Sequence, residues 1–197
     1  MKEVFLKNSV DFISKYNKDY TTDDIEKIKY GLEGIYLTIT KLIIILFLAI
    51  ILKIIKEILL VLIFFNIIRF PAFGVHANKS SICLISSILF IIGLPYLIFN
   101  INTPIYIKII ICFICFIHYL IFAPADTPKR PLTNIKKRKY RKLASCVLAL
   151  IYIILIFILK NNFLVNSIFS ALIIEAIMIN PITYKLLGVQ FNNYKKC

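Results

Sequence analysis

Charge is scarce in this chain of 197 residues, and tryptophan is absent. Only 17% of the residues are charged and 60% are hydrophobic, whereas a soluble domain has about 25% charged and about 45–50% apolar residues. No charged side chain interrupts the runs Ser80 to Ile107 and Leu143 to Leu159, and apolar runs of about 18 residues are typical of membrane-spanning helices. The composition therefore excludes a soluble globular domain, a coiled coil and a disordered chain. We predict an all-α integral membrane protein.

The five cysteines are an odd number scattered through apolar segments. They form neither a disulfide framework nor a zinc-site spacing, so we expect no metal and no cofactor, and nothing points to a nucleic-acid partner. The first 30 residues carry six Lys and six acidic residues, which is unlike a cleavable signal peptide. We expect cytoplasmic or interfacial helices over 1–34, the second beginning at 21–24, where capping side chains and acids suit a helix N-terminus.

About six hydrophobic segments follow, and each is predicted to be helical. They cover 35–52, 54–68, 81–100, 104–123, 143–159 and 163–179. Three charged residues separate the first two, so 35–68 is either two spans, one interfacial helix or a bent hairpin. In the absence of tryptophan, the expected interface anchors are tyrosines such as Tyr36, Tyr106 and Tyr119.

A single membrane domain over 1–197 is expected. Its parts are helices over 1–34, four spans over 35–123 with a turn at 69–83, a basic loop over 124–142, two spans over 143–179 and a tail over 180–197. The basic loop holds eight Lys or Arg residues and one acid, Asp126. Short loops rich in Lys and Arg remain in the cytoplasm. The alternation of spans then predicts a multi-pass protein of the cell membrane with both termini in the cytoplasm.

The connection 69–83 carries the candidate catalytic residues. Pro71 and Gly74 prevent a continuous helix, which predicts a structured turn at the membrane surface. With Ser80 as the N-cap, Cys83 lies in the first turn of the next helix. Free amide groups and the positive helix end there stabilise a thiolate, lowering the thiol pKa from about 8.5, and the same amides suit an oxyanion.

His76 is the expected partner of Cys83. On an unbroken helix the two residues are about 10.5 Å apart along the axis, too far for a hydrogen bond, but a turn can fold His76 back over Cys83. A thiol and an imidazole in contact form a minimal activated nucleophile. The alternative interpretation is a core cysteine beside an interfacial histidine.

Several motifs together resemble the accessory gene regulator B (AgrB) family, integral-membrane cysteine endopeptidases of Gram-positive quorum sensing. The residues similar to the family signature are Arg69, Gly74, His76, Ala77 and Cys83. The stretch 123–132 resembles the family's other characteristic segment, and 30–33 is also similar. Phe73 departs from the pattern, because many members have two glycines before the residue that precedes the His. The resemblance extends over the whole chain in length, order of spans and spacing of motifs.

The resemblance implies a peptidase that cuts a short AgrD-like precursor on its C-terminal side through a thioester and promotes thiolactone cyclisation to an autoinducing-peptide precursor. It implies Cys83 as the nucleophile, His76 as general base and then acid, and a homodimer. The family's precursor has an acidic C-terminal region, so the basic loop is expected to dock it and also to contact anionic membrane lipids. The docking candidates are Lys129, Arg130, Lys136, Lys137, Arg138 and Lys139.

Four more residues are candidates for orienting or supporting roles. Asp126 either orients the imidazole or caps a turn in the Pro-rich loop. Arg69 either pairs with a carboxylate or anchors a span end, and Gly74 shapes the turn. Glu175, an acid within a span, is a functional candidate by default; it snorkels, pairs with Arg69 or polarises the site.

The remaining candidates have plainer interpretations. Cys112, Cys115 and Cys146 are expected to be packing residues, and Cys197 an exposed thiol. His118 is either an alternative base or a packed histidine with a backbone partner. Two other classes of function stay open: a non-catalytic exporter or transporter of small peptides, and a membrane scaffold. The exporter is disfavoured because the sequence lacks a nucleotide-binding motif, internal repeats and several midplane ionisable groups.

Overall fold

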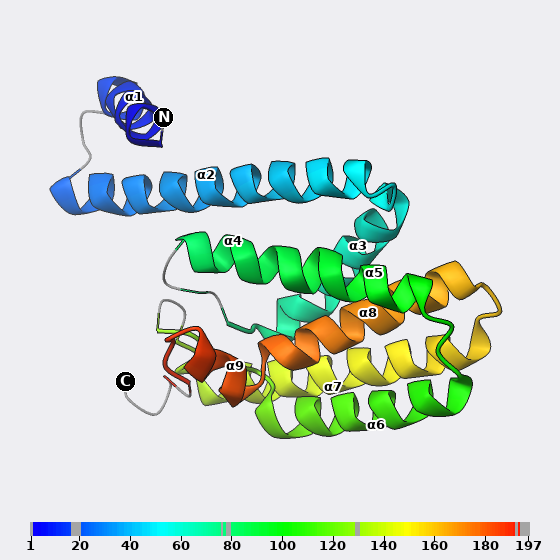
Figure 1. Cartoon of the computed structure of the whole chain (residues 1–197). Helices are drawn as coiled ribbons and strands as arrows, with labels where there is room; N and C mark the ends of the chain where they lie inside the picture. Colours follow the sequence, from blue (N-terminus) through cyan, green and yellow to red (C-terminus); the bar gives the residue numbers. More distant parts are fainter. Residues whose placement is uncertain are drawn as a thin grey trace. The chain divides into compact units, whose positions relative to one another are not determined.

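The structure is a computed structural model and describes residues 2–16, 21–75, 77, 80–128, 131–191 and 193. Its helices are α1 Lys2–Tyr16, α2 Thr22–Ile51, α3 Ile55–Ala72, α4 Ser80–Ile88, the π-helical turn η1 Leu89–Gly93, α5 Leu94–Asn100, α6 Ile105–Phe122, α7 Ile135–Ile158, α8 Asn162–Met178 and α9 Pro181–Leu186 (Figure 1). Outside the helices, Phe73 and Ala125 form an isolated parallel bridge. The predicted all-α class is confirmed.

The predicted hydrophobic segments correspond to α2, α3, the α4–η1–α5 run, α6, α7 and α8. Four helices in the described part of the chain are long and apolar enough to cross a membrane. They are Asp23–Ile51, Ser81–Asn100, Ile105–Phe122 and Ile135–Ile158. Helix α8 is apolar but has only 17 residues, and α3 carries Lys56, Glu57 and Arg69. These helices support a multi-pass membrane protein.

The chain divides into two compact units, Met1–Leu48 and Ala49–Cys197. In the first unit the Phe5 and Tyr36 rings stack with centroids 5.3 Å apart. The expected start of the second helix is confirmed. The Asp24 amide donates to Thr21 Oγ1 at 3.3 Å and the Thr21 amide donates to Asp24 Oδ2 at 3.2 Å, which is reciprocal N-terminal capping. Because the helix then continues to Ile51, the interfacial helix and the first span are one element.

Helix α8 forms the core of the second unit, packed against α3, α5, α6 and α7. Eleven of its 17 residues are buried, so its neighbours separate it from lipid on nearly every side. Two small polar residues inside it need no partner on another helix, because Ser167 and Ser170 donate to carbonyls one turn earlier, at 2.8 and 2.7 Å. Small side chains of this kind let helices approach closely in membranes.

The third predicted span is a single apolar helix with a π-helical interruption. Leu89–Gly93 forms η1, and Pro95 lies in the first turn of α5. Proline has no amide N–H and its ring clashes with the carbonyl four residues earlier. A π-turn just before the proline accommodates both effects, so the helix continues through it.

The predicted basic loop is partly helical. Helix α7 begins at Ile135, because the Asn134 side chain accepts the Lys137 amide at 3.1 Å and caps the helix. Six of the eight cations of 124–142 therefore lie on the first turns of α7. The predicted hydrophobic segment begins at 143, where the charged residues end. The helix itself begins earlier, because Lys and Arg are good helix formers.

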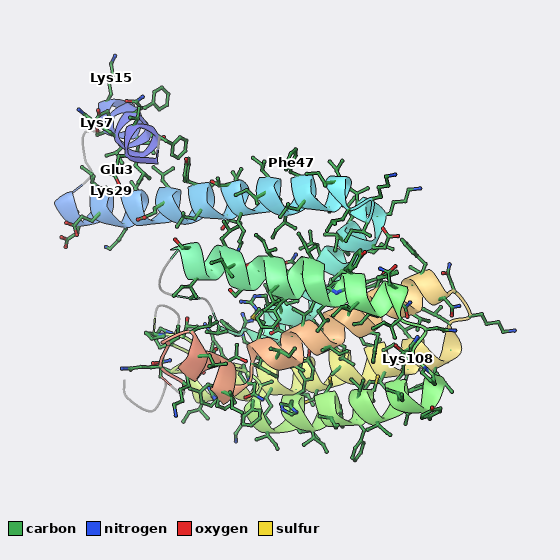
Figure 2. The ribbon with its side chains drawn as sticks, viewed as in Figure 1. Glu3, Lys7, Lys15, Lys29, Phe47 and Lys108 are labelled. Atoms are coloured by element: carbon green, nitrogen blue, oxygen red, sulfur yellow. The ribbon has the colours of Figure 1, made fainter. Side chains whose placement is uncertain are left out.

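Lys108 of α6, labelled in Figure 2, contacts the first half of α8. Its ammonium group donates to Asn166 Oδ1 at 2.9 Å and lies 5.9 Å from the centroid of the Phe169 ring. The opposite end of α8, at Met178, holds the candidate site.

Candidate active site

The predicted turn between the second and third hydrophobic segments follows the end of α3. Pro71 lies within the last turn of α3, and the chain leaves the helix at Phe73, with φ 68°, and Gly74, with φ 110°. Glycine adopts such angles without steric cost, whereas Phe73 does not. Phe73, the residue that departs from the family pattern, therefore has a backbone φ that favours glycine.

Three backbone hydrogen bonds fix this turn to distant segments. The Gly74 amide donates to Ala125 O at 3.0 Å, and the Ala125 amide donates back to Ala72 O at 2.9 Å. The Val75 amide donates to Met178 O, at the end of α8, at 3.0 Å. The two sequence motifs, 69–83 and 123–132, are thus neighbours in space.

Arg69 links the turn to the core helix α8. Its Nη1 lies 3.1 Å from Glu175 Oε2, and its Nη2 donates to Val75 O at 3.0 Å. Glu175 is fully buried, and its Oε1 has no hydrogen-bond partner among the described residues. Of the three roles proposed for Glu175 from the sequence, pairing with Arg69 is the one that the structure shows.

Gly74 leaves no room for a side chain beside this ion pair. A Cβ at this position would lie 2.9 Å from Arg69 Nη1 and 3.2 Å from Glu175 Oε1. Both the positive φ and the close approach require glycine here. Arg69, Gly74 and Glu175, singled out separately from the sequence, therefore form one cluster.

Cys83 is the fourth residue of α4, one position further into the helix than expected, because Ser80 is already helical. Its side chain is half-buried and is not in a disulfide. His76 lies outside the described residues, so its pairing with Cys83 stays a prediction. The described chain stops on one side of His76 at Val75, which the cluster above holds in place, and resumes at Ala77.

Asp126 is fully buried and both of its carboxylate oxygens accept backbone hydrogen bonds. Oδ1 accepts from the Asn193 amide at 3.1 Å, and Oδ2 accepts from the Leu132 amide at 3.2 Å. Arg138 Nη1 lies 3.9 Å from Oδ2. These contacts favour the turn-capping role, while the orienting role stays a prediction.

Tyr184 holds the same region from α9. Its hydroxyl donates to Ala125 O at 2.7 Å, and its ring packs on Phe191 with centroids 5.0 Å apart. Burial raises the pKa of the Tyr184 phenol, so the hydroxyl keeps its proton and remains a donor. No sequence motif indicated Tyr184 or Asn193, because their partners are 59 and 67 residues away.

We expect Asp126→Ala to lower stability more than catalysis. Removing the carboxylate leaves the Leu132 and Asn193 amides without their acceptor and removes a counterion of Arg138, which costs about 2–4 kcal/mol. The measurement is the thermal melting point in detergent alongside the initial rate per folded molecule. Lys160→Ala, at an exposed position between α7 and α8, is the control. A rate loss of about 100-fold or more in a variant that melts normally would establish the orienting role instead.

The other candidates are distributed as follows. Cys112 and Cys115 are buried and Cys146 is half-buried, as expected for packing residues. His118 Nδ1 lies 2.9 Å from Ile114 O, the backbone partner expected of a packed histidine. Cys197 lies outside the described residues.

The docking candidates do not form one uniform group. Lys136, Lys137 and Lys139 are exposed, whereas Arg138 is only 20% exposed and turns toward Asp126. Lys129 and Arg130 lie outside the described residues. Beside the turn is a cavity of about 680 Å³, whose lining includes Arg69, Phe73, Gly74, Leu132 and Arg141.

The described helices include several that are able to cross a bilayer, and the helix after the fixed turn carries a thiol. These features define the class: an all-α multi-pass membrane protein with a candidate thiol site. The family model for accessory gene regulator B matches residues 6–179. The chain belongs to the accessory gene regulator B family. Membership supports a role in the accessory gene regulator quorum-sensing system and an association with its propeptide.

Individual relatives agree with the family model. An AgrB-like protein of Clostridium acetobutylicum is 33% identical, over 91% of this chain and 87% of its own length. An AgrB-like protein of Listeria monocytogenes serovar 1/2a is 31% identical, over 91% and 90%. The accessory gene regulator protein B of Staphylococcus carnosus is 31% identical, over 70% and 71%. The search of solved structures finds no significant match.

Proposed function

We propose that this protein is a membrane cysteine endopeptidase that cleaves an AgrD-like precursor peptide and cyclises the retained fragment as a thiolactone. The observation that carries the proposal is the fixed turn: Arg69, Glu175 and Gly74 hold the backbone at Val75, next to His76, and the following helix carries the half-buried Cys83. A nucleophile and its base need such a rigid support.

The proposed reaction has two acyl transfers. His76 takes the proton of the Cys83 thiol, the sulfur attacks the scissile carbonyl, and the protonated imidazole gives the proton to the leaving amine. The retained fragment is then a thioester on Cys83. His76 then takes the proton of a cysteine thiol in that fragment, and the sulfur of this thiol attacks the thioester. The protonated imidazole gives the proton to the departing Cys83 sulfur, and a thiolactone is released.

The second transfer explains the choice of a thiol over a hydroxyl. It exchanges one thioester for another, so little free energy is lost, whereas an oxygen-ester intermediate would make thiolactone formation uphill. Water competes with the cyclising thiol, and a site at the membrane boundary limits its access. The cavity beside Arg69 and Gly74 is the proposed place for the precursor near its cut site.

The test of the proposal is thiol reactivity. In a variant that keeps Cys83 and replaces the other four cysteines by serine, we expect iodoacetamide to label Cys83 with a pH profile that shifts in His76→Ala. The matched control keeps Cys146, a second half-buried thiol among the described residues. Equal labelling rates at Cys83 and Cys146, with no effect of His76→Ala, would contradict an activated thiol.

The proposed setting follows from the same residues. We infer a cell-membrane protein with the basic segment and both termini in the cytoplasm, contacting anionic lipid, and working as a homodimer of single-domain chains. Arg141 Nη1 donates to Phe70 O at 2.6 Å, so the basic start of α7 contacts the end of α3 that leads into the turn, and this contact supports the proposal.

We expect the exposed lysines of α7 to help capture the acidic part of the precursor. Replacing Lys136, Lys137 and Lys139 by glutamine should raise KM about tenfold with little change in kcat, because surface charges steer association. Arg138 is left in place since it pairs with Asp126. The effect should shrink at high salt, and a precursor with a neutral C-terminal segment is the control. Unchanged capture at low salt would contradict docking.

A further inference from the structure

A groove of about 800 Å³ lies between the end of α3 and the beginning of α7. Ile67 and Phe70 line it from α3, and Leu148 lines it from α7. Lys136, Lys137 and Arg141, also on α7, bring three cations to the same groove. We propose that the groove is a specific binding site for one anionic phospholipid, with the phosphate at the cations and an acyl chain along the apolar part.

The polarity of the groove changes along α7. Its cations lie at the beginning of the helix, and Leu148 lies within the charge-free run that starts at Leu143. From Lys137 to Leu148 the helix rises about 16 Å, and α7 is among the helices long enough to cross a bilayer. The groove therefore runs from the headgroup region into the hydrocarbon, in the direction in which a phospholipid itself changes from polar to apolar.

The cationic end suits a phosphate. Lys136 and Lys137 are exposed, and the Arg141 guanidinium is held by Phe70 O and by the Phe70 and Phe73 rings, whose centroids lie 5.1 and 4.6 Å from its Cζ. A preorganised guanidinium loses little conformational freedom on binding. Asp126, the one acid between residues 124 and 142, is buried and accepts other bonds.

Aromatic residues flank this end of the groove. Phe70 is 76% exposed and Tyr140 is 74% exposed, and both line the groove. Tyrosine side chains gather at the level of the lipid headgroups in membrane proteins. Their position agrees with a groove that opens at the interface.

A lipid fits this groove better than a peptide. An acyl chain has no hydrogen-bonding groups, so none is left without a partner in the hydrocarbon. A peptide at the depth of Leu148 would carry backbone amides and carbonyls without partners, because α3 and α7 use their own backbone groups within the helices. An acidic peptide is therefore expected at the cations alone, and not along the groove.

The test counts bound lipid on the intact protein by native mass spectrometry, after exchange into detergent with dioleoylphosphatidylglycerol or dioleoylphosphatidylcholine. We expect one retained phosphatidylglycerol, with affinity about tenfold above phosphatidylcholine. Lys136→Gln with Lys137→Gln should remove this preference. The matched control, Lys139→Gln with Lys142→Gln, removes the same charge from residues that do not line the groove and should preserve it.

Two further arms separate the alternatives. Leu148→Trp fills the apolar part without changing charge and should weaken lipid retention about tenfold, and inorganic phosphate should not displace the lipid. Four results would each overturn the proposal: equal losses in both lysine pairs, equal retention of the two lipids, displacement of the lipid by phosphate, or unchanged lipid retention in Leu148→Trp. Because the readout is lipid binding and not cleavage, the proposed peptidase function stands or falls separately.

Discussion

Replacement of Cys83 by alanine is expected to abolish precursor cleavage, with a loss of about 10⁴-fold or more. The thiol is the proposed nucleophile of both acyl transfers, and no other cysteine among the described residues lies close to the turn in the sequence. The assay is cleavage of a synthetic precursor by protein reconstituted in vesicles, with the fragments identified by mass. Cys146→Ala, at another half-buried cysteine, is the control and should retain activity.

Cys83→Ser gives this prediction a second measurement. A serine can form only an oxygen ester, so any residual cleavage should release linear peptide and no thiolactone. Intact cleavage in Cys83→Ala, or thiolactone produced by Cys83→Ser, would refute the assigned nucleophile. Loss of folding is checked by the melting point of each variant in detergent.

The second large effect is expected at Arg69. Arg69→Lys keeps a cation for Glu175 but cannot also reach Val75 O with the planar fork of a guanidinium. We expect kcat to fall about 10–100-fold and KM to change less, because the backbone next to His76 loses its support while the exposed lysines of α7 that capture the precursor are unchanged. The melting point should fall by only a few degrees.

Glu175→Ala separates positioning from simple stability. It leaves the Arg69 guanidinium without its buried counterion, which costs about 3–5 kcal/mol, so folding and rate should both decline. Glu175→Gln retains an acceptor for Arg69 and should recover part of the rate. A normal kcat in Arg69→Lys would show that the contact with Val75 is dispensable, and equal melting points across the three variants would contradict a buried ion pair.

Much of the helical layout could be predicted from the hydrophobic runs. The run from Ile105 to Phe122 was expected at 104–123, and the capping box at Thr21 was readable because its donors and acceptors are three residues apart. The start of α7 could not be placed from the runs. The charged residues mark where the membrane begins, but the helix extends through Lys and Arg on the N-terminal side of that point. Helix α7 begins only at its N-cap, Asn134.

The candidate site was predictable in its residues but not in its contacts. An acid within a span needs a partner, yet the choice of Arg69 for Glu175 depends on how α3 and α8 rotate against each other across 106 residues of sequence. Asp126 was a candidate for orienting His76, and its link to Asn193 has no local signal. Long-range packing decides these contacts, and one sequence does not encode them in any short pattern.

The buried helix α8 has a further consequence, through hydrophobic mismatch. Its 17 residues are about 25 Å long, whereas the 24 residues of α7 are about 36 Å long, and a hydrocarbon core is about 30 Å thick. The Val75 amide donates a hydrogen bond to Met178 O in the last turn of α8. The depth of the segment around Val75 in the membrane therefore depends on where this shorter helix ends. We therefore expect longer acyl chains to submerge that segment and shorter ones to raise it toward the water, so that bilayer thickness changes how much water competes for the proposed thioester.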